Sequence, residues 1–339
     1  MTPTSLHERR FLAYEDSATV PNIVVDGAPN DATVLAISHW PGIPTPPGLG
    51  ADLSVQMVFA YLDQQPDHAP AEVVTNNHFD QDGLAGLFAL VSPDEADRHR
   101  DLLVDLAAAG DFGTYRHRAS ARASMIVAAY GDAERSPVAD QIKDRPYPEQ
   151  VAVLYEEALP LTTAMLTEPD RFRDLWAEED EALTEGEQAI IAGQVAIDQD
   201  RALDLAVITV PEALGGRGGH RFVGQEFPEL HPMAVQNATD CVRLLLVQGR
   251  RYRYVDRYET WVQYRSRELP RRVDLQPLAE RLTAREPGSV RWRATPPSSL
   301  TPMLACDEES ALDPVTVRNE IADHLREAPA AWDPYRLKV

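Results

Sequence analysis

The sequence predicts an α/β protein whose N-terminal domain contains a mainly parallel sheet. Over the first 145 residues, apolar strand-like runs alternate with helical patterns, which is typical of strand–helix–strand units. A stretch rich in Glu, Leu and Ala follows, and segments rich in Tyr, Val and Trp come later. We therefore expect an α/β domain over residues 1–145, a helical connector over 146–194, and a smaller α/β C-terminal domain with antiparallel strands over 195–339.

The first strand and helix are predicted from their apolar residues. Residues 1–30 are mostly polar and are expected to be largely irregular. The continuous apolar run at 33–37 predicts a strand buried on both faces. After a loop rich in Pro and Gly, residues 53–62 predict a helix capped by Asp52 or Ser54.

A second strand leads directly into a second helix. Residues 72–76 predict a short strand. From Leu84 to Val91, apolar residues recur at i, i+3, i+4 and i+7, which is one face of a helix. A further helix is expected over 93–109 and ends at Gly110.

The C-terminal half mixes strands with helices. Residues 241–247 predict either a strand or the end of a helix. The other predicted elements, in chain order, are a strand at 203–210, antiparallel strands within 251–264, a helix at 274–286, a half-buried strand at 290–294 and a last helix around 317–325.

Composition limits the class of protein. The chain is 44% hydrophobic and 25% charged, which is typical of a globular protein and excludes disorder as the dominant state. It contains no apolar run of the roughly 20 residues that span a bilayer, and its first residues hold no apolar signal core. Cys241 and Cys306 are far apart and form no disulfide framework. We expect a soluble, cytoplasmic protein without a membrane partner.

The net charge of −22 restricts the partners that we expect. Phosphate backbones repel an acidic surface, so the chain is not expected to wrap extensive duplex nucleic acid. A nucleotide or short oligonucleotide in a locally basic, metal-loaded cleft remains compatible with this charge. The charge does not predict an oligomeric state.

The most informative segment runs from Thr75 to Gly83. It places His78, Asp80 and Asp82 directly after a predicted strand and before a helix, where parallel α/β sheets bind ligands. Because these three residues alternate, a locally extended backbone would point them to one side. Imidazole and carboxylates together suit Mn²⁺, Mg²⁺, Fe²⁺ or Zn²⁺. The alternative is an Asp-rich turn that caps the following helix.

The pattern His78-x-Asp80-x-Asp82-Gly83 after a strand resembles the first motif of the DHH phosphoesterase superfamily. The resemblance implies that these residues bind Mn²⁺ or Mg²⁺, and that the substrate is a phosphoester. The loop Gly218-Gly219-His220 is similar to the substrate-binding glycine loop of that family. The Asp-His-His triplet of the family is absent, which leaves open a divergent member with replacement ligands or a degenerate one.

Three further residues are candidates for the same site. His39 ends the first predicted strand, and we predict that it acts as a ligand or a general acid, or else hydrogen-bonds the Pro-rich loop that follows. Asp111 lies in a predicted loop and is the candidate for a further metal ligand, because it could correspond to the isolated second-motif Asp that the resemblance implies. His117 lies in the same loop, between two arginines, either as a catalytic residue or as part of a solvated polar surface.

These features together predict a metal-dependent hydrolase. The expected substrate is a small phosphorylated compound, either a nucleotide or a short oligonucleotide, with catalysis assisted by His39 or His117 and substrate held by Gly218, Gly219 and His220. Two alternatives remain. One is a hydrolase that uses a metal on a substrate without phosphate, and the other is a binding protein that kept the fold without catalysis.

Overall fold

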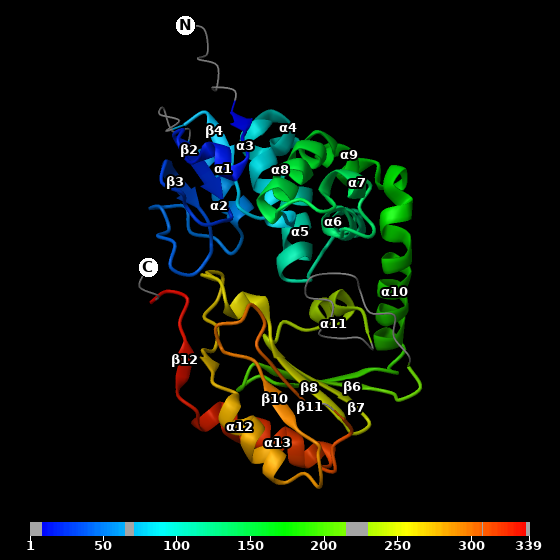
Figure 1. Cartoon of the computed structure of the whole chain (residues 1–339). Helices are drawn as coiled ribbons and strands as arrows, with labels where there is room; N and C mark the ends of the chain where they lie inside the picture. The colour runs from blue at the N-terminus through cyan, green and yellow to red at the C-terminus, as the bar shows by residue number, and fades with distance from the viewer. Residues whose placement is uncertain (1–8, 65–70, 215–229, 307, 337–339) are drawn as a thin grey trace, which may run out of the picture. The chain divides into compact units, whose positions relative to one another are not determined.

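The computed structural model describes residues 9–64, 71–214, 230–306 and 308–336, and it combines helices with sheets as an α/β fold (Figure 1). The chain forms two compact units. The first contains the chain up to Asp180 together with the short segment Tyr264–Ser266. The second contains Glu181–Gln263 and the residues from Arg267 onward. The division falls inside the long helix α10 (Arg173–Ile191).

A four-stranded sheet forms the centre of the first unit, and all its paired strands are parallel. The strand order is β1-β4-β2-β3, so β4 and β2 are the inner strands. Every residue of β2 is buried, because its apolar side chains are covered on both faces. The strands are β1 (Arg10–Phe11), β2 (Asn22–Val25), β3 (Thr33–Ile37) and β4 (Val73–Thr75).

Helices α1, α2 and α3 pack against this sheet, and further helices follow along the chain up to α10. Helix α3 is buried along almost its whole length, because it packs against α2, α5 and the sheet. In chain order the helices are α1 (Tyr14–Ser17), α2 (Ser54–Asp63), α3 (Gln81–Val91), α4 (Pro93–Arg98), α5 (Arg100–Asp111), α6 (Arg118–Gly131), α7 (Ala139–Ile142), α8 (Tyr147–Ala158), η1 (Leu159–Leu161), α9 (Thr162–Thr167) and η2 (Pro169–Phe172).

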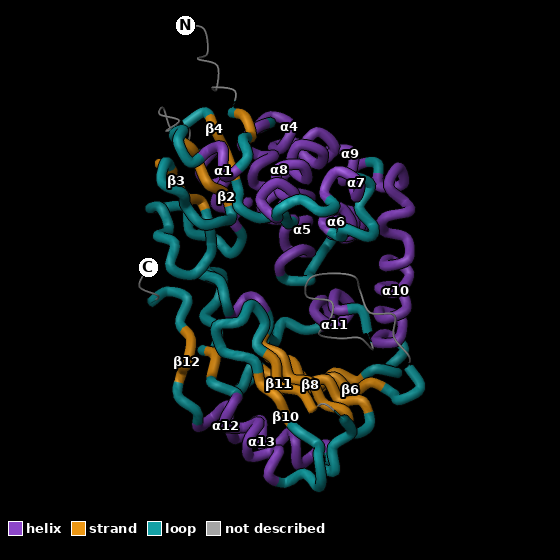
Figure 2. Tube along the Cα trace, in the orientation of Figure 1, coloured by secondary structure: helices purple, strands orange, loops and turns teal. Residues whose placement is uncertain are grey.

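The second unit contains a six-stranded mixed sheet in the order β10-β11-β8-β7-β6-β5. Only β6 and β7 pair in parallel, and the other pairs are antiparallel. One face of the sheet forms a core with α12 and α13 (Figure 2). The strands of this sheet are β5 (Ala196–Asp200), β6 (Leu205–Val210), β7 (Arg243–Gln248), β8 (Arg251–Asp256), β10 (Trp292–Ala294) and β11 (Met303–Cys306).

The remaining elements of the second unit are short apart from its last two helices. A separate two-stranded antiparallel sheet joins β9 to β12. These elements are α11 (Pro232–Ala238), η4 (Tyr258–Thr260), β9 (Arg272–Val273), α12 (Gln276–Ala284), α13 (Pro314–Glu327) and β12 (Ala330–Trp332).

Several predicted elements need correction. The segment before residue 30 is less irregular than predicted, because its described residues 9–30 contain β1, α1 and β2. Strand β3 is not buried on both faces, since it is the edge strand and Val34 is 51% exposed. Neither Asp52 nor Ser54 caps α2, whose N-cap position is Leu53. The helix predicted over 93–109 is interrupted near His99 and forms α4 and α5.

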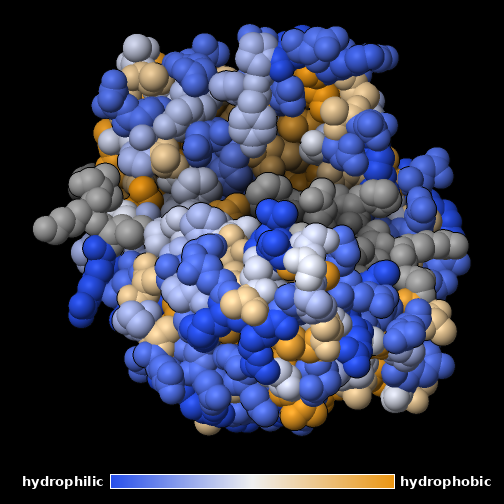
Figure 3. Space-filling model, turned by 60° about the horizontal axis from the view of Figure 1, so that its bottom comes forward, coloured by the Kyte–Doolittle hydropathy of each residue, from blue (hydrophilic) through white to orange (hydrophobic). Residues whose placement is uncertain are grey.

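None of the helices in the described part of the chain has both the length and the apolar character needed to cross a membrane. Hydrophilic side chains cover most of the face drawn in Figure 3, with smaller hydrophobic areas among them.

Candidate metal centre

The parallel sheet brings three chain segments to one edge. Asp26 directly follows β2, His39 follows β3, and His78 follows β4. Because parallel strands end at the same edge of a sheet, residues distant in sequence meet there. Asp82 joins them from the first turn of α3.

Asp26 occupies the middle of this cluster. Its carboxyl oxygen Oδ1 lies 3.3 Å from Nε2 of His39, and Oδ2 lies 3.4 Å from Nε2 of His78. The hydroxyl of Ser54 donates a hydrogen bond of 2.7 Å to Oδ1. Asp26 is only 1% exposed and has a positive φ of 48°, an uncommon backbone conformation for a residue with a side chain. The fold therefore holds this carboxylate in one place.

Two sets of potential ligands share Asp26. We name Asp26, His39 and Asp82 the buried triad, and Asp26, His78 and Asp80 the outer triad. In each triad, one donor atom from every residue lies within 4.8 Å of the others. All members of the buried triad are inaccessible to solvent, whereas the side chains of His78 and Asp80 are 19% and 28% exposed. Imidazole and carboxylate donors at this spacing suit a divalent cation.

The orientation of the His39 ring follows from its surroundings. Its Nδ1 lies 2.5 Å from the carbonyl oxygen of Asp52. A carbonyl oxygen only accepts hydrogen bonds, so Nδ1 carries a proton and Nε2 is the nitrogen left to face the carboxylates. Nε2 faces Asp26 and lies 3.4 Å from Oδ2 of Asp111. This is the arrangement found in metal-binding histidines, whose second nitrogen is held by another group.

The two aspartates of the sequence motif also have structural roles. Asp80 is the N-cap of α3 and accepts a hydrogen bond of 2.9 Å from the N–H of Gly83. Both carboxyl oxygens of Asp82 accept hydrogen bonds from the start of α2, at 2.6 Å from Ser54 N and 2.7 Å from Val55 N. Each carboxyl oxygen has two lone pairs, so these bonds leave room for a cation.

The charges in the cluster are unevenly compensated. Burial, together with the neighbouring charges of Asp26 and Asp80, raises the pKa of Asp82 well above its ordinary value. Burial, and then the charge of Asp82, also raises the pKa of Asp111. Burial alone would raise the pKa of Asp26, but the hydrogen bond and charges of His78 and His39 outweigh it and lower that pKa. The donor set is thus richer in carboxylates than in cationic groups, which fits a divalent cation.

Comparison with known proteins places the chain in a family. A family model matches residues 7–336, which is nearly the whole chain. The chain belongs to this family, the family of unknown function DUF6687. No curated protein matches the sequence. Both triads lie inside the part of the chain that defines membership of DUF6687.

The structure brings the predicted ligands together by a different route from the one expected. The backbone from His78 to Asp82 is not uniformly extended, because α3 begins at Gln81. Asp80 therefore stays beside His78, while Asp82 turns into the interior next to His39. Asp111 is the last residue of α5 and not part of a loop, and it approaches His39 without belonging to either triad.

The other predicted site residues lie elsewhere. His117 is exposed at the N-cap of α6, and its N–H donates to Asp105. Within the described residues it belongs to neither triad. Gly218, Gly219 and His220, predicted to bind substrate, lie outside the described residues.

Sequence reasoning missed Asp26, the residue shared by both triads. A signal was present, because the apolar run Ile23–Val25 ends in Asp26-Gly27. This is the same pattern of a strand followed by an acid and a glycine that drew attention to Asp82 and Gly83. The short strand β2 lies among polar residues, and its pattern was therefore assigned to an irregular segment.

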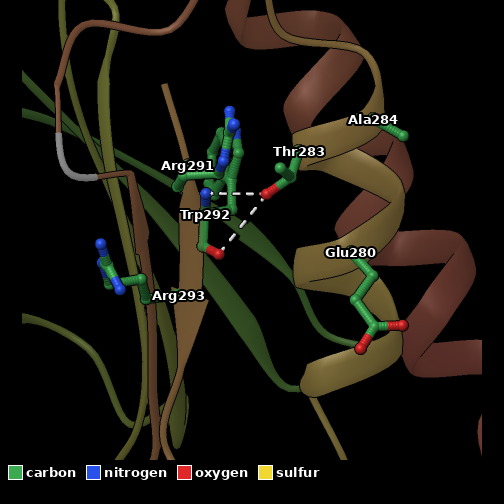
Figure 4. Close-up of a pocket in the computed structure, with 6 residues that line it drawn as sticks. All are labelled: Glu280, Thr283, Ala284, Arg291, Trp292 and Arg293. Carbon is green, nitrogen blue, oxygen red and sulfur yellow. Dashed lines mark hydrogen bonds between the residues drawn. The ribbon is translucent and has the colours of Figure 1, made fainter. Parts of the chain in front are cut away.

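The second unit contains a separate pocket with a volume of about 380 Å³ between β10 and α12 (Figure 4). It is lined by Glu280, Thr283, Ala284 and Arg291–Arg293. The Thr283 hydroxyl accepts a hydrogen bond of 2.9 Å from Trp292 N, which covers the edge of β10. Arg291 donates to carbonyl oxygens of its own loop. None of the described lining residues belongs to a triad, so the pocket adds nothing to the metal centre.

Proposed function

We propose that this protein is a metal-dependent phosphoesterase that hydrolyses a small nucleotide or a short oligonucleotide, with Mn²⁺ or Mg²⁺ bound in the two triads. The observation that carries this proposal is the position of Asp26, whose two carboxyl oxygens face different histidines. A carboxylate shared between two donor sets is suited to a pair of metal ions that act on one substrate.

The residues of the two triads have different roles in this proposal. His39 and Asp82 complete the buried triad, and the carbonyl oxygen of Asp52 keeps Nε2 of His39 directed at the carboxylates. His78 and Asp80 complete the outer triad, whose partial exposure gives a substrate access. The bound ions would polarise the phosphoryl group and lower the pKa of a bound water. His39 fits the role of ligand better than that of general acid, since its Nε2 faces buried carboxylates.

The choice of a phosphoester is supported by the resemblance to DHH phosphoesterases. Three residues carry the resemblance. His78 and Asp80 belong to the outer triad, and Asp82 belongs to the buried triad. In this proposal Asp26 and His39 act as replacement ligands where the Asp-His-His triplet is missing. The family DUF6687 itself adds no substrate to this argument.

The proposal is tested by stripping the purified protein with EDTA and reloading it with Mn²⁺ or Mg²⁺. Hydrolysis of p-nitrophenyl phosphodiesters and dinucleotides is expected only after reloading. The Asp26→Asn variant, which keeps the size of the side chain, is expected to lose this activity and the bound metal together. Asp63→Asn is the matched control, because Asp63 is an exposed carboxylate on α2 that pairs with Arg100.

Two outcomes would contradict the proposal. Hydrolysis of p-nitrophenyl carboxylic esters without any phosphodiester hydrolysis would indicate a hydrolase for substrates that lack phosphate. Failure of the stripped wild-type protein to take up Mn²⁺ would favour a non-catalytic binding protein, in which Asp80 and Asp82 serve only to cap α3 and α2.

A further inference from the structure

A closed cycle of hydrogen bonds surrounds the main chain of His78. The N–H of His78 donates to Oδ1 of Asn76 at 3.2 Å. Nδ2 of Asn76 donates to the hydroxyl oxygen of Tyr155 at 3.1 Å, and that hydroxyl donates to the carbonyl oxygen of His78 at 2.8 Å. Both main-chain polar groups of His78 are thereby fixed, and with them the direction in which its imidazole leaves the chain.

Tyr155 reaches this place from a distant part of the sequence. It lies on α8, 77 residues after His78, and its side chain is completely buried. Its ring packs against Phe11 and Phe79, with ring centroids 5.2 and 5.1 Å apart. These contacts hold the ring, so the hydroxyl has a defined position in the cycle.

The surrounding backbone leaves little freedom for the cycle to shift. A Cβ atom on Gly83 would lie 2.9 Å from Oδ1 of Asp80 and would also collide with Asn76 Nδ2 and the Tyr155 hydroxyl. On the other side, Oδ1 of Asn77 accepts a hydrogen bond of 3.2 Å from Ala28 N, which ties this segment to the one that follows Asp26.

We infer that Tyr155 is a positioning residue for the outer triad, an inference that rests on the proposed function. Its hydroxyl holds the main chain of His78 so that Nε2 stays 3.4 Å from Asp26 Oδ2 and 3.0 Å from Asp80 Oδ2. Tyr155 contributes no donor atom to the triad. It acts through His78, in the way that groups behind a metal ligand set the orientation of that ligand.

The test is the Tyr155→Phe variant, which removes the hydroxyl and keeps the ring. The dissociation constant for Mn²⁺ at the outer triad is expected to rise by about 10- to 100-fold, the usual effect of losing a group behind a metal ligand. Calorimetric titration of the stripped protein with Mn²⁺ measures this. Tyr61→Phe is the matched control, because Tyr61 is a buried tyrosine near the far end of α2 whose hydroxyl bonds Arg9.

A double-mutant cycle separates positioning from a general loss of stability. If Tyr155 acts through His78, Tyr155→Phe should change the remaining Mn²⁺ affinity no further in a His78→Ala background. An equal loss of affinity with and without His78 would overturn the inference. So would a Tyr155→Phe protein that binds Mn²⁺ as tightly as the Tyr61→Phe control.

The metal-free protein provides an independent measurement. Amide hydrogen exchange at His78 is expected to be faster in Tyr155→Phe than in wild type, because the hydrogen-bonded cycle is opened. If wild type takes up no Mn²⁺, the proposed function fails. The role of Tyr155 in holding His78 is then supported by faster exchange and overturned by unchanged exchange.

Discussion

Gly83 lies where the start of α3, the Asn76 amide and the Tyr155 hydroxyl converge. Alanine normally favours a helix over glycine by about 1 kcal/mol. At Gly83 the added methyl group would displace packed polar groups, and such overpacking costs about 1–3 kcal/mol. We therefore expect Gly83→Ala to lower the urea midpoint of unfolding in EDTA, against the usual helix preference.

The same substitution elsewhere gives the control. Gly131 is the last residue of α6, and a Cβ atom there would meet only Phe79 Cδ1, at an ordinary 3.7 Å. Gly131→Ala is expected to leave stability unchanged or to raise it slightly. If both variants unfolded at the same urea concentration, the space beside Gly83 would not be filled as described.

Single residues also show what the sequence could reveal about the site. His78, Asp80 and Asp82 are close in sequence, so a motif could identify them. Asp26 and Tyr155 take part only because the sheet and α8 bring distant segments together, and a single sequence carries no record of that proximity. Local spacing therefore identified part of each triad, whereas the strand, acid and glycine pattern at Asp26 did not show that both triads share this residue.

At the scale of helices, Asp80 combines two functions that substitution can separate. Asparagine is as good an N-cap as aspartate, but it lacks the charge that binds a cation. Asp80→Asn is expected to keep the stability of the metal-free protein and to weaken Mn²⁺ binding. Asp80→Ala is expected to weaken Mn²⁺ binding and also to lower the free energy of unfolding of the metal-free protein by about 0.5–2 kcal/mol.

Urea unfolding in EDTA and Mn²⁺ titration of the same preparations measure the two effects separately. If Asp80→Asn binds Mn²⁺ as tightly as wild type, Asp80 is not a metal ligand and serves only as the N-cap of α3. The sequence already offered both interpretations of this aspartate. They turn out to be compatible, because the carboxyl oxygen bonded to Gly83 N is Oδ1, whereas Oδ2 faces His78.

Whole elements were predictable where their pattern was long or strongly apolar. The helix from Leu84 to Val91 is part of α3, and the strand predicted at 72–76 contains β4. Strands of two to four residues, such as β1 and β2, are too short to show a period. They exist because neighbouring strands and helices cover them, and this tertiary support is absent from the local sequence.

For the molecule as a whole, the cluster links stability to pH in the metal-free state. Burial raises the pKa of Asp82 and Asp111 well above the ordinary 3.8, so the folded protein binds these protons more tightly than the unfolded chain does. Stability is then lost as the pH rises above about 3.8 and through the raised pKa values. Burial alone would lower the pKa of His78, but Asp80 and Asp26 outweigh burial, and the net pKa is raised. The contribution of His78 to stability is therefore also lost as the pH rises.

Asp26 has the opposite effect only at lower pH. Its lowered pKa stabilises the fold above 3.8, and this contribution is lost as the pH falls through the folded value. In the pH range above about 3.8 the contributions of Asp82 and Asp111 therefore change with pH, and above about 6.5 the contribution of His78 changes in the same direction. The net charge of −22 adds self-repulsion throughout this range.

A divalent cation binds the deprotonated donors, and it should relieve the repulsion that makes them costly. We therefore expect Mn²⁺ to raise the melting temperature by more at pH 8 than at pH 6, relative to the same protein in EDTA. Asp26→Asn, which removes the carboxylate common to both triads, is expected to abolish the difference. The same ionic strength with Na⁺ controls for screening of the acidic surface. An equal Mn²⁺ effect at both pH values, or a larger one at pH 6, would show that the buried carboxylates do not bind the ion.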